Sequence, residues 1–159
     1  MLRQIQKNIF IYKFLTGLTP IGFTKFTMSY ITFDPNEIGS VFGTASGKMI
    51  IEKLEGKIVI KAWKEIEKNF PYCILGDCAL RPDSFSGIIM VDNEQVLDNP
   101  RKFIPKALTS FKNRSTLLLN QFHGTHGRVF WENNYQENFI EDIYDLKDAL
   151  NELKVSYIS

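Results

Sequence analysis

Two serines, Ser84 and Ser86, stand where the segment LRPDSFSGIIMV passes from a turn into an apolar run. Pro82 restricts the backbone and the next residues can bond back to it, so RPDS predicts a tight turn. The apolar, β-rich residues that follow predict a strand. Residues two apart in a strand point to the same face, so the two hydroxyls share one side of it. Two metal ligands would suit these positions, but serine hydroxyls are poor ligands for soft or borderline divalent ions.

Few other residues offer metal-binding or nucleophilic chemistry. Cys73 and Cys78 form a C-x4-C pair with no third cysteine, and we interpret them as buried, reduced thiols. His123 and His126 lie in HGTH with no acid nearby in the sequence, so we interpret them as solvated loop histidines or phosphate contacts. A nucleophile at Ser84 would lack a candidate general base. We therefore expect no metal and no cofactor.

Charge is separated along the chain, although the net charge is only +1. The segment 101–128 contains six basic residues and no acid, whereas acids dominate from residue 132 onward. A surface polarised in this way can hold phosphates on its basic side. Alternatively, the basic helix packs beside the acidic one. The candidate nucleic-acid contacts, including two aromatic residues for base stacking, are Lys102, Lys106, Lys112, Arg114, Arg128, Trp131 and Tyr135.

The composition is that of a folded protein, with 159 residues, 44% hydrophobic and 13% aromatic. No apolar run approaches the roughly 20 residues that span a membrane, so we expect no transmembrane span and a cytoplasmic location. Residues 1–22 form a basic extension in which Ile5, Ile9, Phe14 and Leu18 could share one face of an amphipathic helix. This extension either packs on the domain or attaches to a membrane surface or a protein partner.

The elements that must position these residues mix strands with helices. Apolar spacing of two predicts strands, and spacing of three and four predicts helices. In chain order we predict a strand at 24–34, a hairpin around GTASG, a helix at 57–70, antiparallel strands at 72–80 and 85–91, a helix at 101–122 and a helix at 137–153. Because βαβ alternation is irregular, the fold class is α+β.

In this order the segments resemble the single-tyrosine HUH transposases, of the REP-associated and small insertion-sequence type, from about Thr24 to Leu153. ALRPDSFSGIIMV stands where that family has M-P-N-H-x-H-G-I-I, and SFKNRSTLLLN is similar to its S-F-K-containing helix. FWENNYQENFIEDIYDLKDAL resembles W-Q-R-N-Y-Y-E-H-I-I-R-D-E-x-x-L without a gap. The resemblance implies a ferredoxin-like antiparallel sheet with helices packed on it, one domain at 23–159, and a homodimer.

In that family two histidines hold a divalent metal that polarises a phosphate of single-stranded DNA, and a tyrosine on a helix attacks it. Ser84 and Ser86 stand at the two histidines, and Gln136 stands at the tyrosine. The neighbouring Tyr135 would point about 100° away on a helix, so we interpret it as structural or base-stacking. The other matching positions are Pro82, Gly87 and Trp131. The resemblance thus implies a relative that lacks catalytic chemistry.

Two functional hypotheses remain. The first is a catalytically inactive transposase-like protein that retains a surface for single-stranded or hairpin DNA. The second is a repurposed structural or interaction subunit that docks on a protein or membrane assembly through residues 1–20. An active transposase is the least favoured interpretation.

Overall fold

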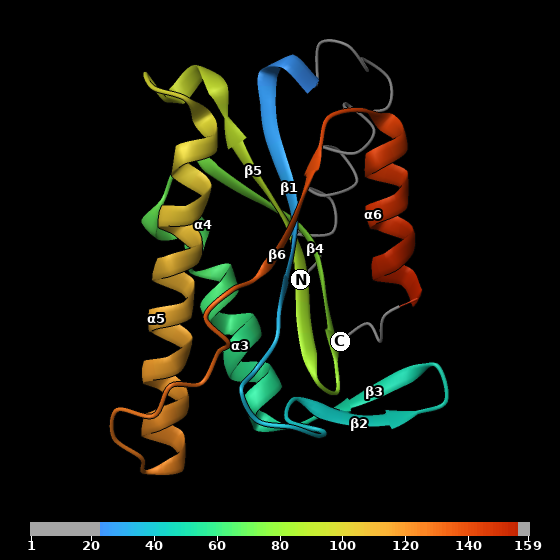
Figure 1. Ribbon diagram of the computed structural model, residues 1–159, viewed down its shortest axis with the longest axis vertical. Coiled ribbons are helices and arrows are strands. Elements are labelled where there is room, and N and C mark those ends of the chain that lie inside the picture. The colour runs from blue at the N-terminus through green and yellow to red at the C-terminus, as the bar shows by residue number, and fades with distance from the viewer. Residues whose placement is uncertain (1–22, 156–159) are drawn as a thin grey trace.

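A four-stranded antiparallel sheet lies at the centre of the computed structural model, which describes residues 23–155 (Figure 1). The strand order is β4-β5-β1-β6. The strands are β1 (Phe26–Phe33), β4 (Cys73–Arg81), β5 (Ser84–Asp92) and β6 (Gln136–Ile140). The three strands predicted at 24–34, 72–80 and 85–91 are therefore confirmed. The turn at RPDS joins two neighbouring antiparallel strands, as predicted.

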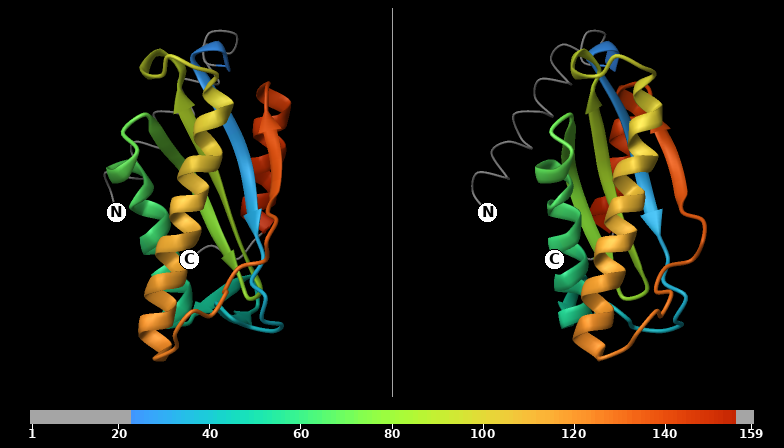
Figure 2. Two further views of the ribbon diagram at one scale, coloured as in Figure 1. Left: turned by 60° about the vertical axis from the view of Figure 1, so that its left-hand side comes forward. Right: turned by 90° about the vertical axis from the view of Figure 1, so that its left-hand side faces the viewer.

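Helices cover both faces of this sheet (Figure 2). Helix α3 (Leu54–Lys64), its short continuation α4 (Ile66–Asn69) and α5 (Phe103–His123) lie on one face, and α6 (Ile143–Val155) lies on the other. The remaining elements are the hairpin of β2 (Gly43–Ser46) and β3 (Met49–Glu52) and the short turns η1 (Asn93–Gln95) and η2 (Pro100–Lys102).

The path β1-α3-β4-β5-α5-β6 with this strand order is the ferredoxin-like βαββαβ arrangement. The β2–β3 hairpin is inserted between β1 and α3, and α6 is added at the end. The predicted α+β, ferredoxin-like class is confirmed.

Two apolar clusters fill the spaces on either side of the sheet. Alternate side chains of a strand point to opposite faces, so β5 sends Phe85 and Ile89 toward α3 and α5 but Ile88 and Met90 toward α6. The α3/α5 side is larger and is rich in aromatic rings. The α6 side is smaller and is made mainly of aliphatic and methionine side chains.

Two glycines permit close packing that a larger residue would prevent. A Cβ at Gly87 would lie 2.7 Å from Cζ2 of Trp63, so this glycine lets the indole rest on the sheet. A Cβ at Gly56 would lie 2.6 Å from the carbonyl oxygen of Phe42. Gly56 thus lets α3 lie close to this backbone. The helix begins at Leu54, three residues before the start that the sequence predicted at residue 57.

The helix predicted at 137–153 is wrong in its first part. Residues Gln136–Ile140 form strand β6, and helix α6 begins at Ile143. Strand β1 offers a free edge to this segment, and five residue pairs form between the two strands. Sheet pairing therefore overrides the helical spacing that Phe139 shares with the later apolar residues.

The predicted basic extension at 1–22 lies outside the described residues. Within residues 23–155, no helix combines the length and the hydropathy that crossing a membrane would need.

Candidate nucleic-acid interface

Ser84 and Ser86 do share one face of β5, as predicted, and both are buried. Their exposed fractions are 5% and 1%. Both serines lie on the α6 side of the sheet. They point to the same face of β5 as Ile88, which packs against α6, and to the opposite face from Phe85. The Oγ of Ser86 is hydrogen-bonded to Oγ1 of Thr32 on β1 at 2.9 Å. One of the two hydroxyls is thus already engaged by a neighbouring strand.

Gln136 lies in the same cross-strand row. Thr32 pairs with Ser86 on one side and with Gln136 on the other, so all three side chains face the α6 side. Strands are about 4.8 Å apart, which places Gln136 and Ser86 roughly 10 Å from each other. The structure therefore brings together the positions that the resemblance matched to a metal ligand and to the nucleophile. However, Gln136 begins a strand and is not on a helix.

The residues of this row do not form a metal site. They are hydroxyls and an amide, which are poor partners for the divalent ions that imidazole or thiolate would hold. Across residues 23–155, no group of three or more His, Cys, Asp or Glu side chains is placed to hold a metal ion. Burial raises the pKa of the Cys73 thiol to about 12 and that of Cys78 to about 11, so neither is a ready thiolate ligand.

Tyr135 packs inward beside the row. Its ring centroid lies 5.3 Å from that of Phe33, and the side chain is half-buried. Burial raises the pKa of its phenol, and the nearby Glu137 carboxylate adds to the effect. These contacts agree with a structural role and oppose a nucleophilic one.

Trp131, predicted as a stacking group, belongs to the core. It is 2% exposed, and its Nε1 donates a hydrogen bond to Oγ of Ser115 at 2.8 Å. A base could not reach its ring without opening the α3/α5 side of the fold. The prediction that Trp131 stacks on a nucleic-acid base is therefore wrong.

Three of the predicted basic contacts are engaged in ion pairs. Lys102 lies 3.0 Å from Asp98, Arg114 Nε lies 3.0 Å from Glu65, and Arg128 pairs with Glu37. Arg114 and Arg128 reach acids that are 49 and 91 residues away in the sequence.

The other two predicted lysines differ from each other. Lys112 donates its Nζ to the carbonyls of Glu132 and Asn133 at 2.8 and 3.2 Å, and burial lowers its pKa. Its ammonium group holds a loop in place. Lys106 is exposed, with its Nζ 5.2 Å from the ring centroid of Phe103.

The alternative that the basic helix packs beside the acidic one is wrong. Helices α5 and α6 lie on opposite faces of the sheet (Figure 1). The bases of α5 instead find acids from several other segments. The nearest approach to the predicted pairing is Arg101, which contacts Glu141 just before α6 at 2.7 Å.

A second basic surface, which the sequence interpretation missed, runs along the first helix. Four exposed lysines share the outer side of α3 and α4, at spacings of four, three and four residues. We call them the lysine stripe: Lys57, Lys61, Lys64 and Lys68. They line an open groove of about 480 Å³ together with Ile60 and Glu65. Their spacing of four, three and four residues is the signal of this surface in the sequence.

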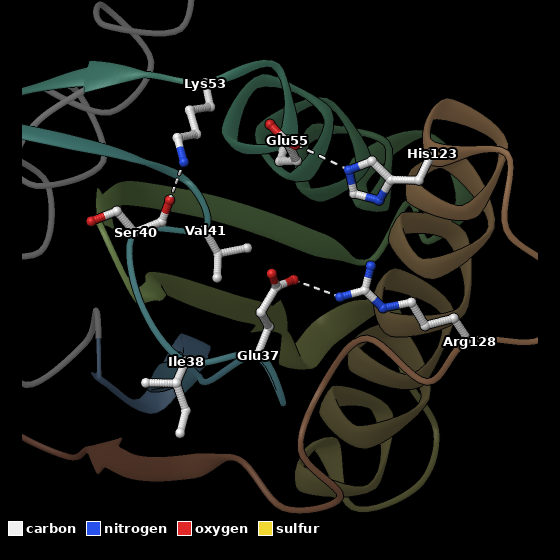
Figure 3. Close-up of a pocket in the computed structure, with 8 residues that line it drawn as sticks. All are labelled: Glu37, Ile38, Ser40, Val41, Lys53, Glu55, His123 and Arg128. Carbon is white, nitrogen blue, oxygen red and sulfur yellow. Dashed lines mark hydrogen bonds and ion pairs between the residues drawn. The ribbon is translucent and has the colours of Figure 1, made fainter.

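A pocket of about 310 Å³ lies between the start of α3 and the end of α5 (Figure 3). His123, the last residue of α5, places its Nε2 3.0 Å from Glu55 Oε1 there, so it is not the solvated loop histidine that was one of the two predicted roles. Burial opposes ionisation of Glu55, but its bonds to His123 and to backbone hold its pKa below the usual value.

The charges of this pocket are matched within it. Arg128 pairs with Glu37, and Lys53 donates its Nζ to the Ser40 carbonyl at 2.6 Å (Figure 3). With its cations engaged by oxygen atoms of the protein, the pocket is a weak candidate for binding phosphate.

The groove between β6 and α6 has the opposite sign to the lysine stripe. It has a volume of about 460 Å³, and its acids come from both elements. They are Glu137, Asp145, Asp148 and Glu152. Burial raises the pKa of Glu137, which Arg101 opposes in part. A polyanion would therefore be repelled from this side of the molecule.

No known protein family matches this sequence, and no curated protein is detectably similar to it. Among solved structures, one described as a REP-associated tyrosine transposase bound to a REP hairpin is similar, with a TM-score of 0.56. The two chains share 10% sequence identity over 80% of this chain and 64% of the other. This chain thus spans less than two thirds of that protein. At this identity the likeness shows the fold alone, a distant HUH transposase-like one.

Proposed function

We propose that this chain binds nucleic acid without cleaving it. The observation that carries the proposal is the row of Ser86, Thr32 and Gln136, in which Ser86 and Gln136 occupy positions matched to the family's reactive groups. The Ser86 hydroxyl is buried and hydrogen-bonded to its neighbour, which makes it a poor metal ligand. The side-chain amide of Gln136 is not a nucleophile that could attack a phosphate. The polypeptide retains the architecture of a transposase but not the side chains for phosphoryl transfer.

The binding half of the proposal is supported by the fold and by the separation of charge. The similar solved structure is described as bound to a REP hairpin, which makes a DNA hairpin the natural first probe. In this chain the lysine stripe lies on one side of the sheet, whereas the acids of the β6–α6 groove lie on the other. A molecule with a small net charge can still bind a polyanion through one basic side.

Fluorescence anisotropy with a labelled DNA hairpin, at two salt concentrations and with or without Mn²⁺, tests both halves. We expect binding that weakens with salt and is unchanged by Mn²⁺, and an intact oligonucleotide on a denaturing gel. An unstructured oligonucleotide of equal length is the control. Cleavage in the presence of Mn²⁺ would overturn the loss of catalysis, and flat anisotropy at low salt would overturn binding.

A second candidate function, docking on a protein partner, is favoured by the β2–β3 hairpin. Ile50 points into the core, but its neighbours Met49 and Ile51 are 67% and 64% exposed. Figure 1 shows this hairpin set apart from the four-stranded sheet. Two exposed apolar side chains on a short, separate ribbon could be buried against a protein partner, which would be favourable. Docking through residues 1–20 and the homodimer both stay predictions.

Light scattering of the full chain and of a Met49→Ser, Ile51→Ser variant tests the hairpin as a contact surface. We expect any self-association of the full chain to be lost in the variant, because the apolar contact is removed. A further variant that lacks residues 1–18 separates this route from docking through the extension. Identical masses for all three proteins, each equal to a monomer, would leave no support for self-docking.

A further inference from the structure

The lysine stripe occupies a narrow arc of the first helix. At about 100° per residue, Lys57, Lys61, Lys64 and Lys68 fall within roughly 60° of one another. Val59, Ala62, Trp63 and Ile66, which are buried, lie on the other side of the same helix. The stripe therefore points straight into solvent, and at about 1.5 Å per residue it is roughly 16 Å long.

Its charges are not compensated by nearby acids. Among residues 23–155 the structure shows no ion pair for any of the four lysines. The one acid in the groove, Glu65, is bonded to Arg114 of α5 at 3.0 Å. Arg114 thus removes the carboxylate that could otherwise have paired with a lysine of the stripe.

The stability of the helix does not explain this arrangement. Like charges three or four residues apart destabilise a helix, and the stripe contains three such consecutive pairs. The helix dipole favours a cation in the last turn, where Lys61 and Lys64 lie in α3 and Lys68 lies in α4, but Lys57 near the start of α3 has no such support. A row of cations that costs stability and lacks partners is what a polyanion ligand requires.

We propose that the lysine stripe binds the phosphodiester backbone of a nucleic-acid strand; this inference rests on the proposed function. Phosphates of one duplex strand advance about 3.4 Å along the axis per nucleotide, so a 16 Å row spans roughly five of them. A membrane surface fits less well, because binding in its interface needs an exposed apolar face. The aliphatic side chains beside the stripe, Ile58 and Ile60, are partly buried against the core.

The position of the stripe has a consequence for the ligand. Helix α3 lies on one face of the sheet, and the row of Ser86, Thr32 and Gln136 faces the other. A strand held on the stripe is separated from that row by the sheet itself. The bound strand is therefore kept on the opposite side of the sheet from the positions that correspond to the family's reactive groups.

Two matched triple variants of the full chain test the assignment. K57Q/K61Q/K68Q removes three charges of the stripe, and K48Q/K147Q/K154Q removes three exposed charges elsewhere, so both have the same net charge. Lys64 is kept because its charge lowers the pKa of the Cys78 thiol against the effect of burial. Thermal unfolding followed by circular dichroism checks that both variants are folded.

Anisotropy with a labelled DNA hairpin is measured as a function of salt for the three proteins. We expect the stripe variant to bind about tenfold or more weakly, and the slope of log K against log salt to flatten by about 2 to 3. The control variant keeps a slope within about one of the wild-type slope, since it loses no phosphate contact.

The outcomes separate this inference from the proposed function. If the wild type binds the hairpin and the stripe variant binds it equally well with the same slope, the stripe is not the contact surface and nucleic-acid binding stands. If the wild type does not bind, the proposed function and this inference fail together.

Binding of the wild type and the stripe variant to vesicles containing phosphatidylserine is measured as well. If the stripe variant loses vesicle binding but keeps hairpin binding, the ligand is a lipid surface.

Discussion

The two faces of the central sheet are built on different principles. Toward α3 and α5, the strands present a continuous core in which Phe33, Phe85 and Phe111 meet the two tryptophans. Toward α6, the same strands present a smaller apolar cluster and a row of polar groups that includes Ser86 and Thr32. Because the larger apolar cluster lies on the first face, we expect that face to contribute more to stability than the second.

The outer surfaces of the two layers differ as well. The α3 side presents the lysine stripe, and the α6 side presents the acidic groove. A net charge near zero thus conceals two surfaces of opposite sign. The comparison teaches that the candidate ligand surface lies over the larger apolar core, whereas the positions matched to the family's reactive groups lie on the side with the smaller core.

We expect the largest loss of stability from Phe111→Ala. The Phe111 ring contacts four other aromatic rings, so its removal should lower the free energy of unfolding by about 3–5 kcal/mol. Leu146→Ala on the α6 side should cost about 2–4 kcal/mol. Urea unfolding of both variants measures the difference. A larger loss for Leu146→Ala would break the ranking of the two faces.

The next effect is expected from Gly87→Ala. The added methyl group would meet the Trp63 indole at 2.7 and 3.0 Å, and both partners are buried. We expect a loss of about 1–3 kcal/mol from overpacking, measured by the same denaturant titration. Gly47→Ala is a useful contrast, since its Cβ would meet no atom within 4 Å and only its positive φ of 61° opposes the change. Wild-type stability for Gly87→Ala would mean that the indole can move aside.

A smaller effect is expected from the polar row. Ser86→Ala removes the bond to Thr32 and should cost no more than about 1.5 kcal/mol, because a neutral hydrogen bond contributes little net stability. A double-mutant cycle with Thr32→Val isolates the pair energy. Hairpin binding should not change in either variant. Weaker binding in Ser86→Ala would move the nucleic-acid surface to the α6 side and break the comparison outright.

The smallest effects concern two glutamates whose pKa values move in opposite directions. The pKa of Glu55 lies below its ordinary 4.5, so its contribution to stability is present above pH 4.5 and is lost as the pH falls through the folded-state value. The pKa of Glu137 lies above 4.5, so stability falls as the pH rises from 4.5 through the folded-state value and changes no further above it.

Stability measured from pH 3 to pH 7 distinguishes the two groups. Glu55→Gln should lose stability near neutrality and show a flatter acid limb, whereas Glu137→Gln should gain stability near neutrality and match the wild type below pH 4.5. Each change should be within about 1 kcal/mol because the groups are partly exposed. Parallel pH profiles for the two variants would contradict the opposite shifts.

Local patterns in the sequence determined several elements correctly. The tight turn RPDS between two β-rich runs predicts the β4–β5 hairpin, since turn chemistry and strand propensity are properties of neighbouring residues. Ile104, Leu108 and Phe111 predict the buried side of α5, and Gly124 ends that helix with a left-handed φ of 66°. The ferredoxin-like order entered through the resemblance of these segments to a family, not through their composition.

Only the tertiary structure decided the remaining features, because they depend on residues far apart in the chain. Gln136–Ile140 became a strand because β1 offered a free edge, although the apolar spacing was helical. Arg114 pairs with Glu65, and His123 is bonded to Glu55; these acids lie 49 and 68 residues away in the sequence. The sequence alone predicts that the four lysines of the stripe share one side of a helix, because they are three or four residues apart. That its charges stay unpaired follows only from the fold, because Coulombic pairing is set by distance in space and not by separation along the chain.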